Sequence, residues 1–178
     1  MQFFLIFLIF QQQIEDVIVT ASAFPDSALN SPYASQAIDQ NEMRLFTRSL
    51  PESLKKIPSV LLQKTAYGQS SPYIRGLTAY RNKMLIDGIP LNFAAMRSGP
   101  NQYWSTVDMY SVKNLEIVKG ISSVLYGSDA IGGVVEAFTK KANLNQNDAF
   151  ISSFTGRYSS AESSYIGRGD FSMNKKNI

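Results

Sequence analysis

The stretch from Leu115 to Lys141 constrains the fold of this chain more than any other feature. It reads LEIVKGISSVLYGSDAIGGVVEAFTKK: an alternating apolar run ending at Lys119-Gly120, a short helical segment closed by Tyr126-Gly127, and a Gly132-Gly133 turn into another strand. A strand, a short helix and a second strand within 27 residues leave too little chain for a parallel βαβ crossover of ordinary size. The stretch therefore predicts a compact strand–helix–strand unit of another kind.

Composition is typical of a folded domain. The 178 residues are 44% hydrophobic and 17% charged, which is too apolar for a disordered chain. The chain has no cysteine and no histidine, so disulfides, the usual zinc and haem ligands and a Ser-His-Asp triad are excluded. The net charge of +3 is scattered in lysine pairs without a basic stripe, so nucleic-acid binding is not indicated. We expect no catalytic residues, no metal site and no cofactor.

The N-terminal region starts with an apolar run. Phe3 to Phe10 is too short for a transmembrane helix but has the length of a signal-peptide core. No basic residue precedes it, and a buried strand is the alternative interpretation. Ile14 to Ala21 follows as a run rich in β-branched residues, and Phe24 to Pro32 is typical of an exposed linker.

Two short helices are expected in the middle of the chain. Asp39 and Glu42 have the spacing of a capping box and predict a helix to about Phe46. Ser49 and Glu52 repeat the spacing and predict a second helix over residues 50–56, which Pro58 ends. A further helical turn is expected over residues 106–112.

Strands and loops alternate around these helices. The expected strands are residues 33–38, 60–64, 73–75 and 83–87, the last ending in an Asp87-Gly88 turn. Residues 66–72 and 92–104 are expected to be loops, and a loop as long as the second is usually functional or mobile.

After Lys141 the pattern changes to alternation typical of a hairpin. One face would carry Phe150, Ser152, Phe154, Gly156, Tyr158, Tyr165, Gly167, Gly169, Phe171 and Met173. The opposite face would carry Ile151, Ser153, Thr155, Arg157, Ile166, Arg168, Asp170 and Ser172. Aromatic and small residues outward with polar residues inward are a weak signature of a membrane β-barrel. An amphipathic hairpin on a soluble sheet fits the same residues equally well.

Three segments together resemble the plug domain of a TonB-dependent outer-membrane receptor in order and spacing. They are Tyr73-Ile74-Arg75-Gly76, the LIDGIPL run from Leu85 to Leu91, and the stretch from Leu115 to Lys141. The resemblance covers roughly Glu15 to Lys141, with Ile121 standing where the family usually has proline.

The resemblance implies an α+β fold, a small mixed β-sheet with short helices, followed by a β-hairpin that resembles the first strands of a transmembrane barrel. The expected organisation is a signal-like segment (1–13), a TonB-box-like segment and linker (14–32), the plug (33–142) and the start of a barrel (143–178). Because barrels of about 22 strands with about ten residues each need far more chain, we expect a plug with no more than the first barrel hairpin.

The function implied by the resemblance is gating of energy-coupled uptake of a scarce ligand, such as a siderophore or cobalamin, in the outer membrane of a Gram-negative bacterium, with the plug facing the periplasm. The implied partners are TonB, the receptor's own barrel and a small-molecule or metal-chelate ligand. A free-standing periplasmic ligand-binding or interaction module is the alternative.

The resemblance also implies three groups of site residues. The TonB-binding segment would be Asp16, Val17, Ile18, Val19, Thr20 and Ala21, although the same run could be the first plug strand. The ligand would meet loops 66–72, 77–82 and 92–104, with Tyr67, Gln69, Tyr80, Arg81, Asn92, Phe93, Arg97 and Tyr103 as candidates. Arg75, Glu116 and Lys119 would contact the barrel, with solvated strand ends as the alternative.

Six glycines stand at the expected ends of these elements. At such positions we predict positive φ or close backbone approach. They are Gly76, Gly88, Gly120, Gly127, Gly132 and Gly133.

Overall fold

A computed structural model describes residues 17–18, 26–27, 33–46, 48–66, 69–92, 99, 103–141, 149–160 and 163–174. The chain forms two compact units, residues 1–139 and 140–178. Each unit is described by itself.

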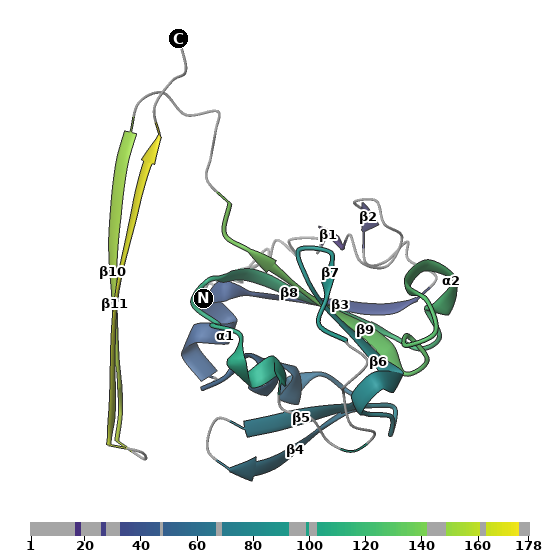
Figure 1. Ribbon diagram of the computed structural model, residues 1–178. Helices are drawn as coiled ribbons and strands as arrows, with labels where there is room; N and C mark the ends of the chain where they lie inside the picture. Colours follow the sequence, from purple (N-terminus) through teal and green to yellow (C-terminus); the bar gives the residue numbers. More distant parts are fainter. Residues whose placement is uncertain are drawn as a thin grey trace, which may run out of the picture. The chain divides into compact units, whose positions relative to one another are not determined.

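A five-stranded mixed sheet organises the first unit, with strand order β3-β8-β9-β6-β7 (Figure 1). The strands are β3 (Ala34–Asp39), β6 (Asn82–Ile86), β7 (Ile89–Pro90), β8 (Val112–Lys119) and β9 (Gly133–Thr139). Only β6 and β9 are parallel; the other neighbours, including β8 and β9, are antiparallel. The expected strand–helix–strand unit is therefore present, with α2 (Ser123–Tyr126) between antiparallel neighbours.

The hydrophobic core lies on one face of this sheet. Leu115 and Ile117 of β8 pack there with Trp104, Met43 and Leu54, all of which are fully buried. These partners come from η3 (Tyr103–Thr106), α1 (Gln40–Phe46) and η1 (Leu50–Lys56), which lie on the same side of the sheet in Figure 1 as the β4–β5 hairpin. A smaller cluster around Leu85, Val118, Ala130 and Val134 occupies the opposite face.

Helix α1 begins where the sequence predicts. Its Glu42 backbone N–H donates to Asp39 Oδ1 over 2.7 Å, which satisfies one of the unpaired donors of the first turn. The second expected cap is wrong, because Ser49 makes no side-chain capping bond and the segment is a 3₁₀ helix, η1. Ser49 is buried, and its hydroxyl faces that of Ser70 at 3.5 Å instead.

The expected loop over residues 66–72 is also wrong. β4 (Val60–Ala66) and β5 (Gln69–Ile74) form an antiparallel hairpin in a separate two-stranded sheet. Ser70 and Ser71, which suggested a loop, are buried, and the Ser70 backbone N–H donates to Ser105 Oγ over 3.0 Å. Arg75, expected in a strand, lies in the following turn with φ of 50°.

Two further boundaries differ from expectation. The helical turn expected over residues 106–112 lies earlier, at η3, and Val112 already belongs to β8. Trp104, expected at the end of a loop, is fully buried in the core. Most of the expected loop 92–104 lies outside the described residues. No helix of the described residues is long and apolar enough to cross a membrane.

The second unit is a long hairpin of β10 (Ala149–Ser159) and β11 (Ser164–Asn174). Its register pairs Phe150 with Met173 and Tyr158 with Tyr165. This pairing confirms both the hairpin and the two faces that alternation predicts.

Candidate functional site

Two cations mark one end of the five-stranded sheet. Arg75 follows β5, and its backbone N–H donates to Ser59 O over 3.0 Å. Lys119 ends β8, and its ammonium donates to Gln36 Oε1 at 3.3 Å and to Pro58 O at 3.4 Å. Burial, and then the charge of Arg75, lower the pKa of Lys119. Among the residues that the structure describes, no carboxylate forms a salt bridge with either cation.

Gly120 allows the two cations to approach. It has φ of 118°, and a Cβ placed on it would lie 2.9 Å from Arg75 Nη1. A side chain here would therefore push the guanidinium away from the end of β8. The neighbouring turn is equally tight, since a Cβ on Gly133 would lie 2.5 Å from Val118 O. The close approach expected at these two glycines is present.

A surface hollow adjoins Arg75. It has a volume of about 460 Å³ and is lined by Ser59, Val60, Leu61, Tyr73, Arg75 and Gly76. Leu61 is 68% exposed within it. The hollow offers apolar surface beside a guanidinium, and so has room for a partner side chain that carries a negative charge.

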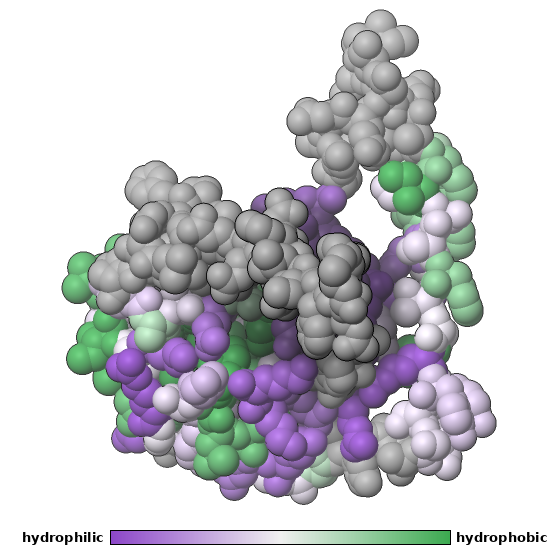
Figure 2. Space-filling view, turned by 180° about the vertical axis from the view of Figure 1, so that it is seen from behind, coloured by the Kyte–Doolittle hydropathy of each residue, from purple (hydrophilic) through white to green (hydrophobic). Residues whose placement is uncertain are grey.

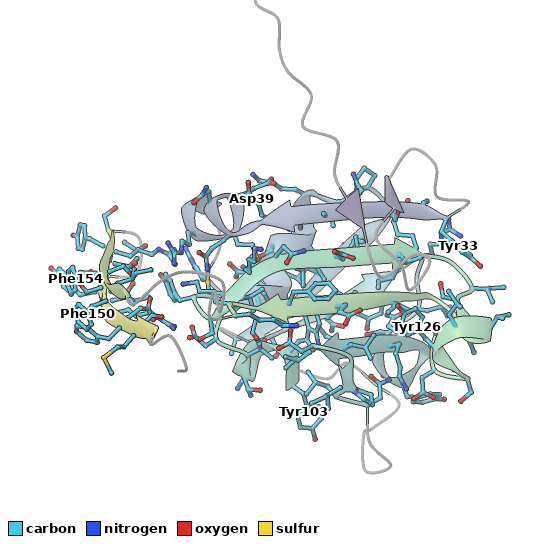
Figure 3. The ribbon with its side chains drawn as sticks, turned by 90° about the horizontal axis from the view of Figure 1, so that it is seen from above. Tyr33, Asp39, Tyr103, Tyr126, Phe150 and Phe154 are labelled. Atoms are coloured by element: carbon cyan, nitrogen blue, oxygen red, sulfur yellow. The ribbon has the colours of Figure 1, made fainter. Side chains whose placement is uncertain are left out.

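Glu116, expected beside these cations, is buried instead. It is only 2% exposed, and its direct partner across the β8–β9 ladder is Glu136, at 6%. Like charges placed opposite each other destabilise a sheet. Tyr126 of α2 lies on this side of the sheet (Figure 3), and burial, then Glu136 and Glu116, raise the pKa of its phenol to about 12. Glu116 therefore does not share the surface of Arg75 and Lys119.

Glu136 is a residue that sequence reasoning missed. Alternation along β9 places it on the same face as Val134, and the β8–β9 pairing then sets it against Glu116. Spacing along the chain does not by itself identify this pairing, so no local sequence pattern singled out Glu136. The carboxylate accepts the Gly88 backbone N–H over 2.9 Å.

The ligand candidates fall into two groups rather than one. Gln69 begins β5, and Tyr103 projects from η3 beside it (Figure 3), where Ser105 bonds to Ser70. Tyr80 and Arg81 lie at the opposite end of β5, where Arg81 O accepts the Gly132 N–H over 2.9 Å. Five strand steps, roughly 17 Å, separate Gln69 from Ile74 at that end, so Gln69 and the Arg81 backbone belong to different ends of the strand.

The Asn92 side chain forms hydrogen bonds within the sheet. Its Oδ1 accepts the Met84 N–H over 3.0 Å, and its Nδ2 donates to Asn82 O over 3.1 Å. Both ends of the amide thus extend the pairing of β6. The candidates Tyr67, Phe93 and Arg97 lie outside the described residues.

The expected TonB-binding segment is described only at Val17 and Ile18. These residues form β1 (Val17–Ile18), which pairs antiparallel with β2 (Asp26–Ser27). Its extended conformation fits a pairing segment. Asp16, Val19, Thr20 and Ala21 lie outside the described residues.

The C-terminal hairpin carries an exposed apolar face. Phe150 and Phe154 project from the same side (Figure 3), and they are 67% and 81% exposed. Cross-strand aromatic contacts join Phe150 with Phe171, at 6.4 Å between ring centroids, and Tyr158 with Tyr165, at 4.9 Å. Apolar colouring is visible along this hairpin in Figure 2. The opposite face holds a polar network in which Arg168 Nε donates to Asp170 over 2.6 Å.

Comparison with protein families identifies a matching domain model. The model of the TonB-dependent receptor plug domain covers residues 27–134, more than half of the chain. The chain belongs to the plug-domain family of TonB-dependent receptors. The mixed sheet with few short helices is the fold of this domain.

Individual proteins similar to this chain are also receptors or transporters by name. A vitamin B12 transporter, BtuB, of Vibrio cholerae is 31% identical over 138 residues, which are 76% of the chain and 22% of the transporter. BtuB of Photobacterium profundum is 29% identical over 125 residues, 69% of the chain and 20% of the transporter. The ferripyoverdine receptor of the outer membrane of Pseudomonas aeruginosa superposes with a TM-score of 0.60 at 19% identity, over 80% of the chain and 18% of the receptor. The plug chain spans about a fifth of the length of these relatives.

Proposed function

We propose that this chain is the gate of an outer-membrane receptor that imports a scarce small molecule or metal chelate with energy supplied through TonB. In this proposal the plug closes a β-barrel, its loops help to bind the ligand, and its N-terminal segment recruits the energising protein. The relatives named for vitamin B12 and ferripyoverdine support a ligand of this size and kind.

The observation that carries the proposal is the cation pair Arg75 and Lys119. Like charges repel, and a partly buried lysine beside an arginine is stable only at a cost that an opposite charge would remove. Burial first, and the charge of Arg75 second, lower the pKa of Lys119. A carboxylate on the inner wall of a barrel, entering the hollow beside Arg75, would pair with both cations and hold the plug in place.

The second unit supports a barrel as the partner. The apolar face of the hairpin extends from the Phe150–Met173 pair to the Tyr158–Tyr165 pair, eight strand steps or roughly 27 Å. At a strand tilt of about 40° this corresponds to a height of roughly 21 Å, close to the apolar band of about 25 Å in outer-membrane barrels. In a barrel wall, lipid would cover the apolar face and water would solvate the face that carries Arg168 and Asp170.

The N-terminal segment supports coupling to TonB. An extended strand such as β1 can pair edge-on with a partner through backbone hydrogen bonds. We assign this role to Asp16, Val17, Ile18, Val19, Thr20 and Ala21, with Gln69 and Tyr103 as the described residues that contribute to the ligand site.

The experiment uses the full-length receptor in detergent. Arg75→Ala combined with Lys119→Ala should loosen the plug and raise hydrogen exchange throughout residues 33–139, on the order of tenfold or more for the loss of two partly buried ion pairs. Lys55→Ala combined with Lys113→Ala is the matched control, because both residues are exposed cations of the same unit and neither is a candidate site residue. Equal exchange in the double variant, the control and the parent receptor would show that the cations do not seat the plug.

A further inference from the structure

The turn between β6 and β7 is built for a tight hairpin. Asp87 and Gly88 have φ of 48° and 82°, and two successive positive φ angles are typical of a type I′ turn. Aspartate is among the few residues other than glycine that adopt such a conformation at low cost. The turn geometry explains why Asp and Gly occupy these two positions, but it does not explain the contacts of the Asp87 side chain.

Four hydrogen bonds join this turn to the end of β9. The Asp87 N–H donates to Ala137 O over 3.0 Å, and the Gly88 N–H donates to Glu136 Oε1 over 2.9 Å. Thr139 donates twice to the Asp87 carboxylate, through its backbone N–H to Oδ1 over 3.0 Å and through its hydroxyl to Oδ2 over 2.6 Å. Both oxygens of one carboxylate therefore hold one residue.

The position of Thr139 gives these bonds their importance. On one edge of β9, the parallel ladder with β6 ends at Ile86 and Ala137, and Asp87 extends the contact on that edge by two residues. On the other edge, the ladder with β8 pairs Thr139 with Val112. Thr139 is the last residue of β9 and of the first unit, and the next residue, Lys140, is exposed. The carboxylate thus binds the chain at the point where it leaves the plug.

We propose that Asp87 is a latch: a positioning residue that keeps the β6 edge of β9 closed to Thr139 and, together with the β8 pairing of that residue, fixes where the tether to the C-terminal hairpin begins. With the latch closed, ten chain steps connect Thr139 to Ala149, a reach of at most about 36 Å. If β9 opened back to Ala137, the tether would gain two residues and about 7 Å of reach. The inference does not depend on the identity of a ligand or of an energising partner.

The bonds are of the stronger kind but are exposed. Hydrogen bonds to an ionised carboxylate are about twice as strong as neutral ones, whereas exposure and salt reduce the gain. Loss of the latch should therefore act locally, on the order of tenfold in the opening equilibrium at Thr139, and leave the interior of β9 unchanged.

The test is amide hydrogen exchange of the 178-residue chain, followed residue by residue by NMR. In Asp87→Ala the Thr139 amide should exchange on the order of tenfold faster, while Val134 and Val135 in the same strand keep their rates. Asp87→Asn should give a smaller change, because its amide oxygen still accepts the Thr139 N–H and asparagine also tolerates the turn.

The second partner is tested by Thr139→Val, which keeps the shape and the backbone donor but removes the hydroxyl. It should raise exchange at residue 139 by less than Asp87→Ala, and Thr139→Ser should restore the parent rate. An unchanged Thr139 rate in Asp87→Ala would overturn the proposal. So would an equal acceleration at Val134, Val135 and Thr139, since Asp87 would then only form the turn.

Discussion

Gly133 offers a sharp test of how the plug sheet is packed. A Cβ at this position would lie 2.5 Å from Val118 O and 3.2 Å from Ile74 Cγ2, whereas ordinary contact begins at 3.4 Å. The carbonyl belongs to β8, which is held on both sides by β3 and β9, so it has little freedom to move away. The methyl group of alanine must therefore be accommodated by displacing a strand in the centre of the sheet.

The magnitude follows from two opposing terms. Overpacking costs about 1–3 kcal/mol, and a clash with central backbone belongs in the upper part of that range. Replacing glycine by alanine gains about 0.4–1 kcal/mol by restricting the unfolded chain. We expect Gly133→Ala to lower the free energy of unfolding by about 2 kcal/mol, which corresponds to a fall of roughly 4–8 °C in Tm for a chain of this size.

Urea denaturation followed by tryptophan fluorescence measures this difference, because Trp104 is the only tryptophan and is fully buried in the core. Gly99→Ala is the matched control, since a Cβ there meets nothing within 4 Å. The control should change the free energy of unfolding by less than about 1 kcal/mol. If the two variants were equally stable, the close β8–β9 approach at Gly133 would be refuted.

Three further predictions concern other parts of the chain. In the full-length receptor, Ile18→Pro should abolish TonB binding in a pull-down without unfolding the plug, because proline removes a ladder donor; normal binding would exclude this segment. Tyr126 has a raised pKa of about 12, against an ordinary value near 10, so it contributes stability that is present below pH 10 and lost as the pH rises from 10 to 12. Urea midpoints measured across this range should therefore fall less in Tyr126→Phe than in the parent chain, and equal falls in the two proteins would contradict the burial of the phenol. Cysteine placed at Phe154 should resist a water-soluble maleimide in the membrane-embedded receptor while cysteine at Arg157 reacts, and rapid labelling at Phe154 would place that face in water.

Local patterns predicted much of this fold. Asp39 and Glu42 define the start of a helix through a hydrogen bond between residues three positions apart, and this bond is present in the structure. The period of two in β10 and β11 sufficed for both strands and both faces. In each case the interactions that decide the structure lie within one element or one hairpin, so the sequence pattern contains them.

Tertiary contacts decided the elements that were missed. The first four residues of β5 were expected to be a loop because Ser70, Ser71 and Pro72 are typical loop residues, yet Ser70 is bonded to Ser105, 35 residues away. Ser49 fits a capping pattern, but burial against Ser70 redirects its hydroxyl. No window of sequence around either residue contains the partner that determines its conformation.

In the candidate site, too, some residues were predicted from the sequence, and the positions of others depend on tertiary contacts. The resemblance to plug domains singled out Arg75 and Lys119, and in the structure burial, and then the charge of Arg75, lower the pKa of Lys119. It also singled out Glu116, whose burial depends on a partner strand that spacing alone does not identify. Tyr80 and Gln69 belong to neighbouring expected loops but lie at opposite ends of β5, because the intervening residues are a strand.

If this chain gates a barrel in the outer membrane, as we propose, it should be found there as part of a larger protein. The most direct measurement is to raise an antibody against the 178-residue chain, fractionate the source cells, and determine where the detected protein lies and what its mass is. The account predicts an outer-membrane protein several times heavier than the 19.8 kDa of this chain. A soluble periplasmic protein of about 19.8 kDa would contradict it and favour a free-standing binding module.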